Sequence, residues 1–307
     1  MPPRHFLIDD DLSPVELEAV LDDAERRKKD RIADQPLSGP QSVALIFEKP
    51  STRTRMSFEV AVAELGGHPI YVDSRTTQLG RGETIEDTAH VLSRYVAAIV
   101  MRTFGQDRIE GLAAAAGVPV INALTDLAHP CQALADLLTI REHKGGLSGL
   151  TLTYVGDGNN VAHSLLLAGC AAGMQVRVAA PQGFEPDPDV VRRANAIGER
   201  TGGTALVTTD PLEAAAGAEV LYTDVWASMG QETDAENKAR VLAPYRIDNR
   251  LVNVASSDVI VLHCLPAHRG EEISAEVMDG PHSRVFDQAE NRLHTSKAIL
   301  AFLLGAA

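Results

Sequence analysis

The chain has 307 residues and a mass of 32.8 kDa, a length that favours two domains over one. Hydrophobic residues make up 45% and charged residues 23%, which excludes disordered, collagen-like and disulfide-scaffold proteins. The formal net charge of −14 argues against a general nucleic-acid or anionic-membrane surface. Cys131, Cys170 and Cys264 form no CxxC pair, and no leader or membrane-spanning stretch is recognised, so we expect a cytoplasmic protein.

Short β-branched runs alternate with segments of helical period, which predicts parallel sheets with crossover helices. The first helix has a capping box formed by Ser13 and Glu16. The expected strands cover residues 42–47, 70–72, 97–101, 118–122, 152–155, 175–180, 205–208, 219–223 and 259–263. A helix over 129–143 is expected to bridge the two series, and a closing helix over 288–304 ends the chain. We therefore predict an α/β fold of two doubly wound parallel-sheet domains joined by helices.

Ligands of open α/β sheets bind beyond the carboxyl ends of the strands. The first strand is followed by Ser51, Thr52, Arg53 and Thr54, with a helical run predicted from about 56 to 65. Hydroxyls, an arginine fork and the free N–H groups of a helix start make an anion cradle. The alternative is an ordinary Ser/Thr helix cap with solvated arginines.

Two further groups with cationic or donor side chains follow later strands of the first series. Arg102 ends the third strand, and His129 and Gln132 flank Pro130 after the fourth. A histidine at a helix start is often only a structural cap. One arginine about 4 Å from a phosphate supplies roughly 4 kcal/mol per charge pair, whereas the net negative charge is screened beyond ~8 Å. An anionic substrate is therefore admissible.

The second series carries a different set of polar residues. Gly156-Asp157-Gly158 matches half of a dinucleotide fingerprint, but Val161 replaces its third glycine, so nicotinamide binding stays a weak alternative. Asn159 and Asn160 offer amides for a small polar ligand. Asp224, at a strand end, is our candidate for receiving an ammonium group, and the acidic residues 232–236 are expected to be solvated.

The last strand leads into His263-Cys264-Leu265-Pro266-Ala267-His268. Because strand residues alternate between faces, His263 and Cys264 should point in opposite directions, which disfavours a Cys–His nucleophile pair. Zinc binding by His263, Cys264 and His268 remains an alternative. Cys131 and Cys170 are interpreted as buried hydrophobes. Cys264 differs from them because it follows a strand at the edge where the other candidates gather.

Together these segments resemble the ornithine carbamoyltransferases. The resemblance rests on five segments in order along nearly the whole chain: residues 47–55 (FEKPSTRTR), Met101-Arg102, His129-Pro130-Cys131-Gln132-Ala133, Asp224-Val225-Trp226 with Ser228-Met229-Gly230, and His263-Cys264-Leu265-Pro266. The first motif and the His-Pro pair are shared across transcarbamoylases, whereas Ser-Met-Gly and His-Cys-Leu-Pro are typical of the ornithine branch. The resemblance implies a carbamoyl-phosphate domain over 1–143, completed by a closing helix at 288–307 that packs back on it, and an ornithine domain over 147–287.

The resemblance also implies roles for individual residues. Those assigned to carbamoyl phosphate are Ser51, Thr52, Arg53, Thr54, Gln78, Arg102, His129, Gln132, Cys264, Leu265 and Arg292; those assigned to ornithine are Asn160, Asp224, Ser228 and Met229. Arg53, Arg102, His129 and Cys264 are the expected catalytic residues. Gln78 would reach the site of a neighbouring subunit, because family members form trimers or multiples of trimers. No metal and no organic cofactor are implied.

The implied reaction is carbamoyl transfer from carbamoyl phosphate to the δ-amine of L-ornithine, giving citrulline and phosphate for arginine biosynthesis. Aspartate would require added cations, yet residues 224–237 contain no Lys or Arg. Putrescine or another amine as acceptor stays open as an alternative. So does a non-catalytic binding protein on the same fold.

Overall fold

The computed structural model describes residues 2–32, 34–226 and 235–306 of the chain. Two compact units are present. Unit 1 comprises Met1–Ala135 together with Glu290–Ala307, and unit 2 comprises Asp136–Ala289. Two helices, α5 (Pro130–Lys144) and α12 (Val285–Leu303), each contribute residues to both units.

The sheet of unit 1 is parallel and has the order β2-β1-β3-β4 among the described residues. Its strands are β1 (Ser42–Phe47), β2 (His68–Asp73), β3 (Ala98–Arg102) and β4 (Val120–Leu124). Connecting helices are α2 (Thr52–Glu64), α3 (Ile85–Leu92) and α4 (Gln106–Ala115), preceded by α1 (Pro14–Lys29). The central strands β1 and β3 are buried along nearly their whole length, as their continuous apolar runs require.

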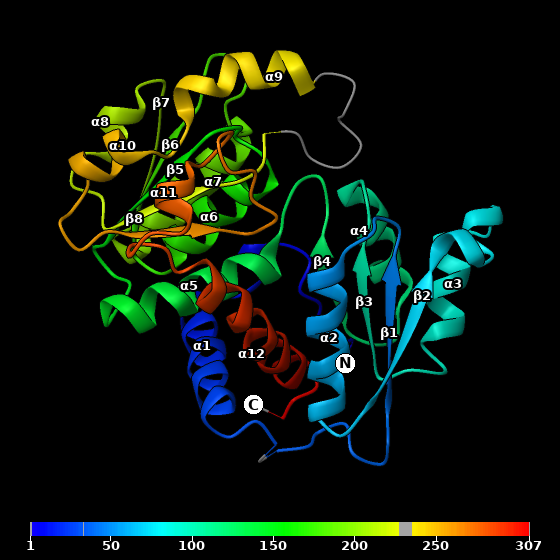
Figure 1. The fold of residues 1–307 in the computed structure, drawn as a ribbon. Coiled ribbons are helices and arrows are strands. Elements are labelled where there is room, and N and C mark those ends of the chain that lie inside the picture. The colour runs from blue at the N-terminus through cyan, green and yellow to red at the C-terminus, as the bar shows by residue number, and fades with distance from the viewer. Residues whose placement is uncertain (1, 33, 227–234, 307) are drawn as a thin grey trace. The chain divides into compact units, whose positions relative to one another are not determined.

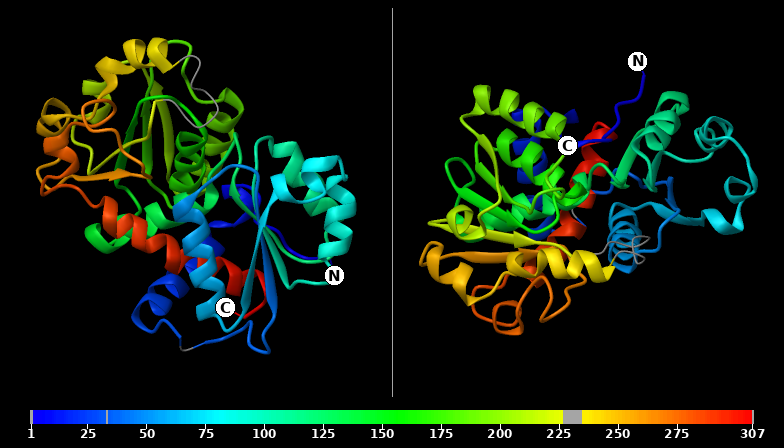
Figure 2. Two further views of the ribbon diagram at one scale, coloured as in Figure 1. Left: turned by 45° about the vertical axis from the view of Figure 1, so that its right-hand side comes forward. Right: turned by 90° about the horizontal axis from the view of Figure 1, so that it is seen from above.

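The C-terminal helix α12 belongs to unit 1 from Glu290 onward. Lys297 is fully buried there, and its Nζ donates to the carbonyl oxygens of Arg27 in α1 and of Arg31 just after it, and to Glu64 of α2. Figures 1 and 2 show this red helix lying beside α1. The expected packing of the closing helix on the first domain is confirmed, with the helix beginning at Val285 rather than at 288.

Unit 2 contains a second parallel sheet, with the order β7-β6-β5-β8-β9 in the described part of the chain. Its strands are β5 (Thr151–Val155), β6 (Gln175–Ala179), β7 (Thr204–Thr208), β8 (Val220–Thr223) and β9 (Ile260–His263). Its helices are α6 (Asn160–Ala171), α7 (Pro188–Thr201), α8 (Pro211–Ala215), α9 (Ala235–Leu242), α10 (Asn249–Val254) and α11 (Ala275–Met278).

Helices cover both faces of the second sheet, which makes it doubly wound. Val155, Leu221 and Val261 point to one face, where they pack in a core with residues of α8, α10 and α11. Tyr154 and Tyr222 point to the opposite face, because successive strand residues alternate, and their rings stack with centroids 5.9 Å apart. The predicted fold class is therefore confirmed. Every helix in the described residues is too short or too polar to cross a membrane.

Candidate active-site residues

The strand order of unit 1 places its candidate residues at a topological switch point. The chain leaves β1 for β2 on one side and then returns to β3 on the other side of β1. At such a point the two connections diverge, and the space outside the carboxyl ends of the strands can receive a ligand. Ser51 follows β1 there, and Arg102 is the last residue of β3.

The anion cradle is the first turn of α2. Ser51 is the N-cap, and its side chain accepts a hydrogen bond from Thr54 N at 3.3 Å. The helix begins at Thr52, four residues earlier than the start expected near residue 56, because this cap already satisfies the first turn. Thr52, Arg53 and Thr54 therefore sit where a helix presents N–H groups and positive dipole to an anion.

Two arginines from distant parts of the chain converge on the buried hydroxyl of Thr54. Arg102 Nη1 donates to Thr54 Oγ1 at 3.4 Å, and Arg292 Nη2 of α12 donates to the same oxygen at 2.5 Å. Arg292 is 5% exposed and Thr54 fully buried. Thr54 and Arg292 lie 238 residues apart in the chain, so no local sequence pattern predicts their contact. It arises because α12 packs on unit 1.

His129 lies in the electrostatic field of the same arginines. Burial lowers the pKa of its imidazole well below the usual value, and the charges of Arg292 and Arg102 lower this pKa further. The ring is consequently neutral at pH 7 and offers one N–H and one lone pair. Gln132, in the first turn of α5, is also buried.

Gln78 and the two cysteines interpreted as hydrophobes, Cys131 and Cys170, are also among the residues singled out from the sequence. Gln78 is exposed and is the N-cap of a short 3-10 turn at Leu79–Arg81. Cys131 is buried, and burial raises the pKa of its thiol to about 12. Cys170 in unit 2 is likewise buried, with a pKa raised to about 12. Both cysteines thus behave as the expected buried hydrophobes.

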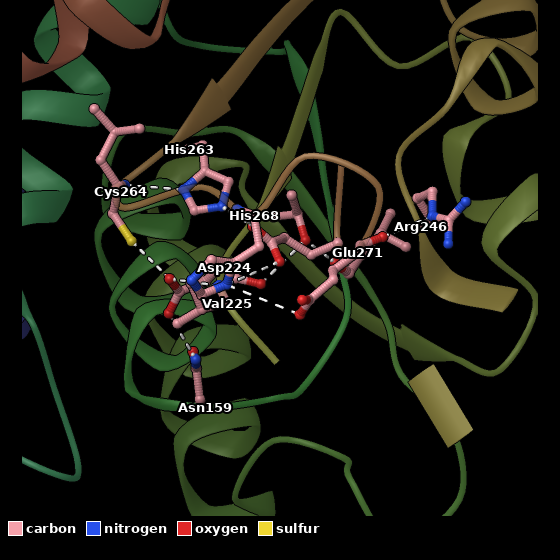
Figure 3. A network of polar contacts seen from close by, with 12 residues as sticks. Asn159, Asp224, Val225, Arg246, His263, Cys264, His268 and Glu271 are labelled. Carbon is pink, nitrogen blue, oxygen red and sulfur yellow. Dashed lines mark hydrogen bonds and ion pairs between the residues drawn. The ribbon is translucent and has the colours of Figure 1, made fainter. Parts of the chain in front are cut away.

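Unit 2 has its own switch point, between β5 and β8. Asn159, the N-cap of α6 after β5, donates from Nδ2 to Asp224 Oδ2 at 2.9 Å. Asp224 directly follows β8, so the two neighbouring strands deliver an amide and a carboxylate to one place (Figure 3). Asn160, the predicted ligand, is the first residue of α6 and is half-buried.

Asp224 also joins the strand edge to Cys264. Only 6% of Asp224 is exposed, and its Oδ1 accepts hydrogen bonds from Val225 N at 2.8 Å and from Cys264 Sγ at 2.9 Å. With Asn159 this gives the carboxylate three donors, which compensates its burial. The thiol of Cys264 is therefore a donor to Asp224, and Figure 3 shows its sulfur directed at that carboxylate.

His263 holds the backbone beyond β9. Its Nδ1 accepts from Leu265 N at 2.9 Å, so Nε2 carries the ring proton and donates it to Glu272 Oε1 at 3.1 Å. Leu265 has a φ of 61°, in the left-handed region that few non-glycine residues adopt. Glu272 is fully buried, and we did not identify it from the sequence, because a carboxylate nine residues after the histidine matches no motif.

The expected opposite orientation of His263 and Cys264 is wrong in part. One ring nitrogen of His263, the Cys264 sulfur and an Asp224 oxygen lie within 4.8 Å of one another, because β9 ends at His263 and strand alternation stops there. Both His263 nitrogens are nevertheless engaged elsewhere. His268 belongs to a different group, with Glu271 and Glu272, so the zinc alternative through His263, Cys264 and His268 does not assemble as envisaged.

The two glycines of the half-fingerprint have structural reasons to be glycine. Gly156 has a φ of 141°, and a Cβ on Gly158 would lie 2.4 Å from the backbone nitrogen of Pro186. Asp157 between them forms an ion pair with Lys238 of α9 at 2.8 Å. These contacts explain Gly-x-Gly without a dinucleotide. Ser228 and Met229, also assigned to ornithine, lie outside the described residues.

Comparisons with known proteins cover both units. The carbamoyl-phosphate-binding domain model of the aspartate/ornithine carbamoyltransferases matches residues 4–142, and the Asp/Orn-binding domain model matches residues 148–303. Ornithine carbamoyltransferases from Acidothermus cellulolyticus and Parafrankia sp. are 66% and 68% identical to the chain, and the alignments cover 99% of it and 97% of each relative.

Solved structures agree with these sequence relatives. The ornithine carbamoyltransferase from Pyrococcus furiosus superposes with a TM-score of 0.95 at 49% identity, covering 100% of this chain and 98% of that one. The enzyme from Gloeobacter violaceus gives a TM-score of 0.90 at 50% identity, covering 99% of each chain.

Proposed function

Because the chain belongs to the aspartate/ornithine carbamoyltransferase family, we propose that it transfers the carbamoyl group of carbamoyl phosphate to the δ-amine of L-ornithine. The products are L-citrulline and phosphate. The observation that carries this proposal is the identity of 66–68% to ornithine carbamoyltransferases over essentially the whole chain. The protein is thus a transferase, and an acceptor such as putrescine is not favoured.

Unit 1 has the chemistry that carbamoyl phosphate requires. The N-terminus of α2 with Ser51, Thr52 and Arg53 would hold the phosphate, which leaves with developing negative charge. Arg102, already directed at Thr54, would share that charge. The N–H groups of the α2 N-terminus and the arginines would be in place before the reaction, so they would need little reorganisation as the phosphate departs.

The carbamoyl group would be polarised by buried donors. A neutral His129 can donate one N–H to the carbonyl oxygen without bringing a further full charge into the site. Arg292 and the Thr54 hydroxyl, which already form a hydrogen bond, would be the other donors to this oxygen. Gln132 and the Leu265 carbonyl would accept from the carbamoyl amide.

Unit 2 offers the groups that an amino acid with a second amine requires. Asp224 would bind the α-ammonium, and Asn160, with Ser228 and Met229, would complete the ornithine subsite. The Cys264 thiol donates a hydrogen bond to Asp224, so the lone pairs of its sulfur remain able to accept a hydrogen bond from the δ-amine. Cys264 would thus orient the neutral amine. As the amine loses its proton, the sulfur would take that proton up while the thiol's own proton passes to Asp224.

In the reaction the δ-nitrogen forms a bond to the carbamoyl carbon, the bond from this carbon to the phosphate oxygen breaks, and the amine loses one proton. Holding two substrates in position contributes ~7 kcal/mol or more to the rate acceleration. No atom changes its oxidation state in these steps, so the reaction requires no electron carrier. The formation of citrulline fits arginine biosynthesis, and we propose arginine biosynthesis as the physiological role.

We further propose a cytoplasmic trimer, or a multiple of trimers, in which Gln78 completes a neighbouring subunit's site. The exposure of Gln78 and the three free thiols support this proposal. Light scattering after size exclusion tests it, with about 98 kDa expected for three chains of 32.8 kDa. A monomer would contradict it.

The activity is tested by incubating the purified protein with carbamoyl phosphate and, in parallel, L-ornithine, putrescine or L-aspartate. We expect citrulline from ornithine and a kcat/KM for the other two acceptors lower by at least a factor of 100. Preferential carbamoylation of putrescine would reassign the acceptor. Binding of carbamoyl phosphate without any product would instead favour the non-catalytic alternative.

A further inference from the structure

Glu48, the residue immediately after β1, has no role in the proposed reaction, yet it lies between the two loops that carry the anion-binding side chains. On one side two residues, Lys49 and Pro50, separate it from the Ser51 cap. On the other side its backbone N–H donates to the carbonyl oxygen of Arg102 at 2.9 Å. Glu48 is therefore joined to the Ser51 cap by the covalent chain and to the end of β3 by a backbone hydrogen bond.

The carboxylate of Glu48 is occupied by two donors from the β3–α4 segment. Arg108 of α4 binds it through both oxygens, with Nε at 2.8 Å from Oε2 and Nη2 at 2.6 Å from Oε1. Thr103, the buried residue next to Arg102, donates its hydroxyl to Oε2. The Glu48 side chain is only 10% exposed, so this is a shielded, two-pronged ion pair with an added hydrogen bond.

We infer that Glu48 is a positioning residue for the phosphate cradle, holding the loop after β1 and the end of β3 in register through Arg108 and Thr103. The inference rests on the proposed function, because it takes a phosphate-bearing substrate as the occupant of the cradle. Glu48 acts through the backbone of Arg102 and through Ser51–Thr54, and it does not touch the substrate.

The negative charge of Glu48, considered alone, predicts the opposite effect on the binding of carbamoyl phosphate. A carboxylate close to a site for a phosphate dianion opposes binding, so removing its charge should strengthen the binding of carbamoyl phosphate. If Glu48 positions the cradle, removing the charge should weaken binding, because the fork to Arg108 loosens and the cradle donors shift. An error of about 1 Å in such donors costs up to about 100-fold in rate. The direction of the change therefore separates the two explanations.

The test is the Glu48→Gln variant of the full chain, which keeps the size of the side chain. We expect the KM for carbamoyl phosphate to rise about tenfold, the KM for ornithine to stay within twofold, and the dissociation constant of inorganic phosphate to rise in parallel. Arg108→Lys keeps the positive charge but loses the fork, so it should raise the same KM by a smaller factor. A double Glu48→Gln/Arg108→Lys variant should be no worse than Glu48→Gln alone.

Glu16→Gln is the matched control. Glu16 forms a comparable two-pronged pair with Arg4, at 2.5 and 2.8 Å, in the same unit but on α1. Its loss should lower stability without changing the KM for carbamoyl phosphate. If Glu48→Gln fails to fold, Arg108→Lys carries the test alone.

An unchanged or lower KM for carbamoyl phosphate and unchanged phosphate binding in Glu48→Gln would overturn the inference. A rise in the KM for ornithine equal to that for carbamoyl phosphate would also overturn it, since this would indicate a general loss of structure. If the unmodified protein forms no citrulline, the proposed function fails. The phosphate-binding comparison still decides the role of Glu48 in that case.

Discussion

Single residues in the two units have distinct electrostatic environments, and this contrast divides the chemistry between them. Thr54 and His129 lie against two arginines, whereas Asp224 is a buried carboxylate surrounded by neutral donors. The first environment favours an anion and the second an ammonium group. Apart from Val225, which follows Asp224 in the chain, the members of each set become neighbours only after folding.

Replacing Cys264 tests the environment around Asp224. We expect Cys264→Ala to raise the KM for ornithine at least tenfold and to change the pH profile of kcat/KM, because Asp224 loses a donor and the amine loses its sulfur contact. The KM for carbamoyl phosphate should change little. Cys170→Ala, which removes a buried thiol elsewhere in unit 2, is the control. An unchanged pH profile would show that the Cys264 thiol only fills space.

His129 tests the first environment through pH. Since burial and the nearby arginines lower its pKa in the folded state, the unfolded chain takes up a proton first as pH falls through about 6.5. His129 thus costs no stability above that pH and reduces stability below it, by at most about 1.4 kcal/mol per pH unit. Urea unfolding at pH 7.5 and 5.5 should show a smaller acid loss for His129→Gln than for the unmodified protein. Equal losses would contradict the assignment.

At the scale of elements, helix α12 carries a buried ion pair and a proposed site residue on adjacent turns. Lys297 pairs at 2.7 Å with Glu64 in a buried position, while Arg292 of the same helix reaches Thr54. Burial lowers the pKa of Lys297, although the hydrogen bond to Glu64 opposes this shift. The helix therefore fixes Arg292 through contacts that lie away from the cradle.

Among the residues that the structure describes, replacing Lys297 with methionine leaves Arg31 as the one cationic partner of Glu64. Loss of one partner of a buried pair costs about 3 kcal/mol in the free energy of unfolding. We expect Lys297→Met to lose about this amount in chemical unfolding and to raise the KM for carbamoyl phosphate through Arg292. A loss below about 1 kcal/mol, with an unchanged KM, would show that α12 is held by its apolar contacts alone.

The sequence predicted the elements far better than the contacts between them. Apolar runs such as residues 42–47 and 151–155 are legible as strands because both faces are buried. The start of α2 was placed too late, because Thr52 to Thr54 are polar and lack the apolar period of the rest of the helix. The partners Asn159–Asp224 and His263–Glu272 depend on strand order and on the backbone at Leu265, which no local pattern encodes.

At the scale of the whole molecule, the same design appears twice. In each unit the strand order reverses beside the first strand of the unit, and the polar residues stand at that reversal. Two such sheets in one chain allow one to bind an anion and the other an amino acid. This duplication explains why the motif segments are spread over most of the chain, from residue 47 to Pro266.

The central claim is that the terminal amine of ornithine, not the α-amine that we propose Asp224 binds, receives the carbamoyl group. The most direct measurement uses ¹³C-carbamoyl phosphate with L-ornithine carrying ¹⁵N only at the δ position, followed by ¹³C NMR of the product. We predict one carbamoyl signal, split by a one-bond coupling to ¹⁵N, formed together with an equal amount of phosphate. An unsplit carbamoyl signal, showing transfer to the α-nitrogen, or phosphate release without a carbamoylated product, would contradict the account.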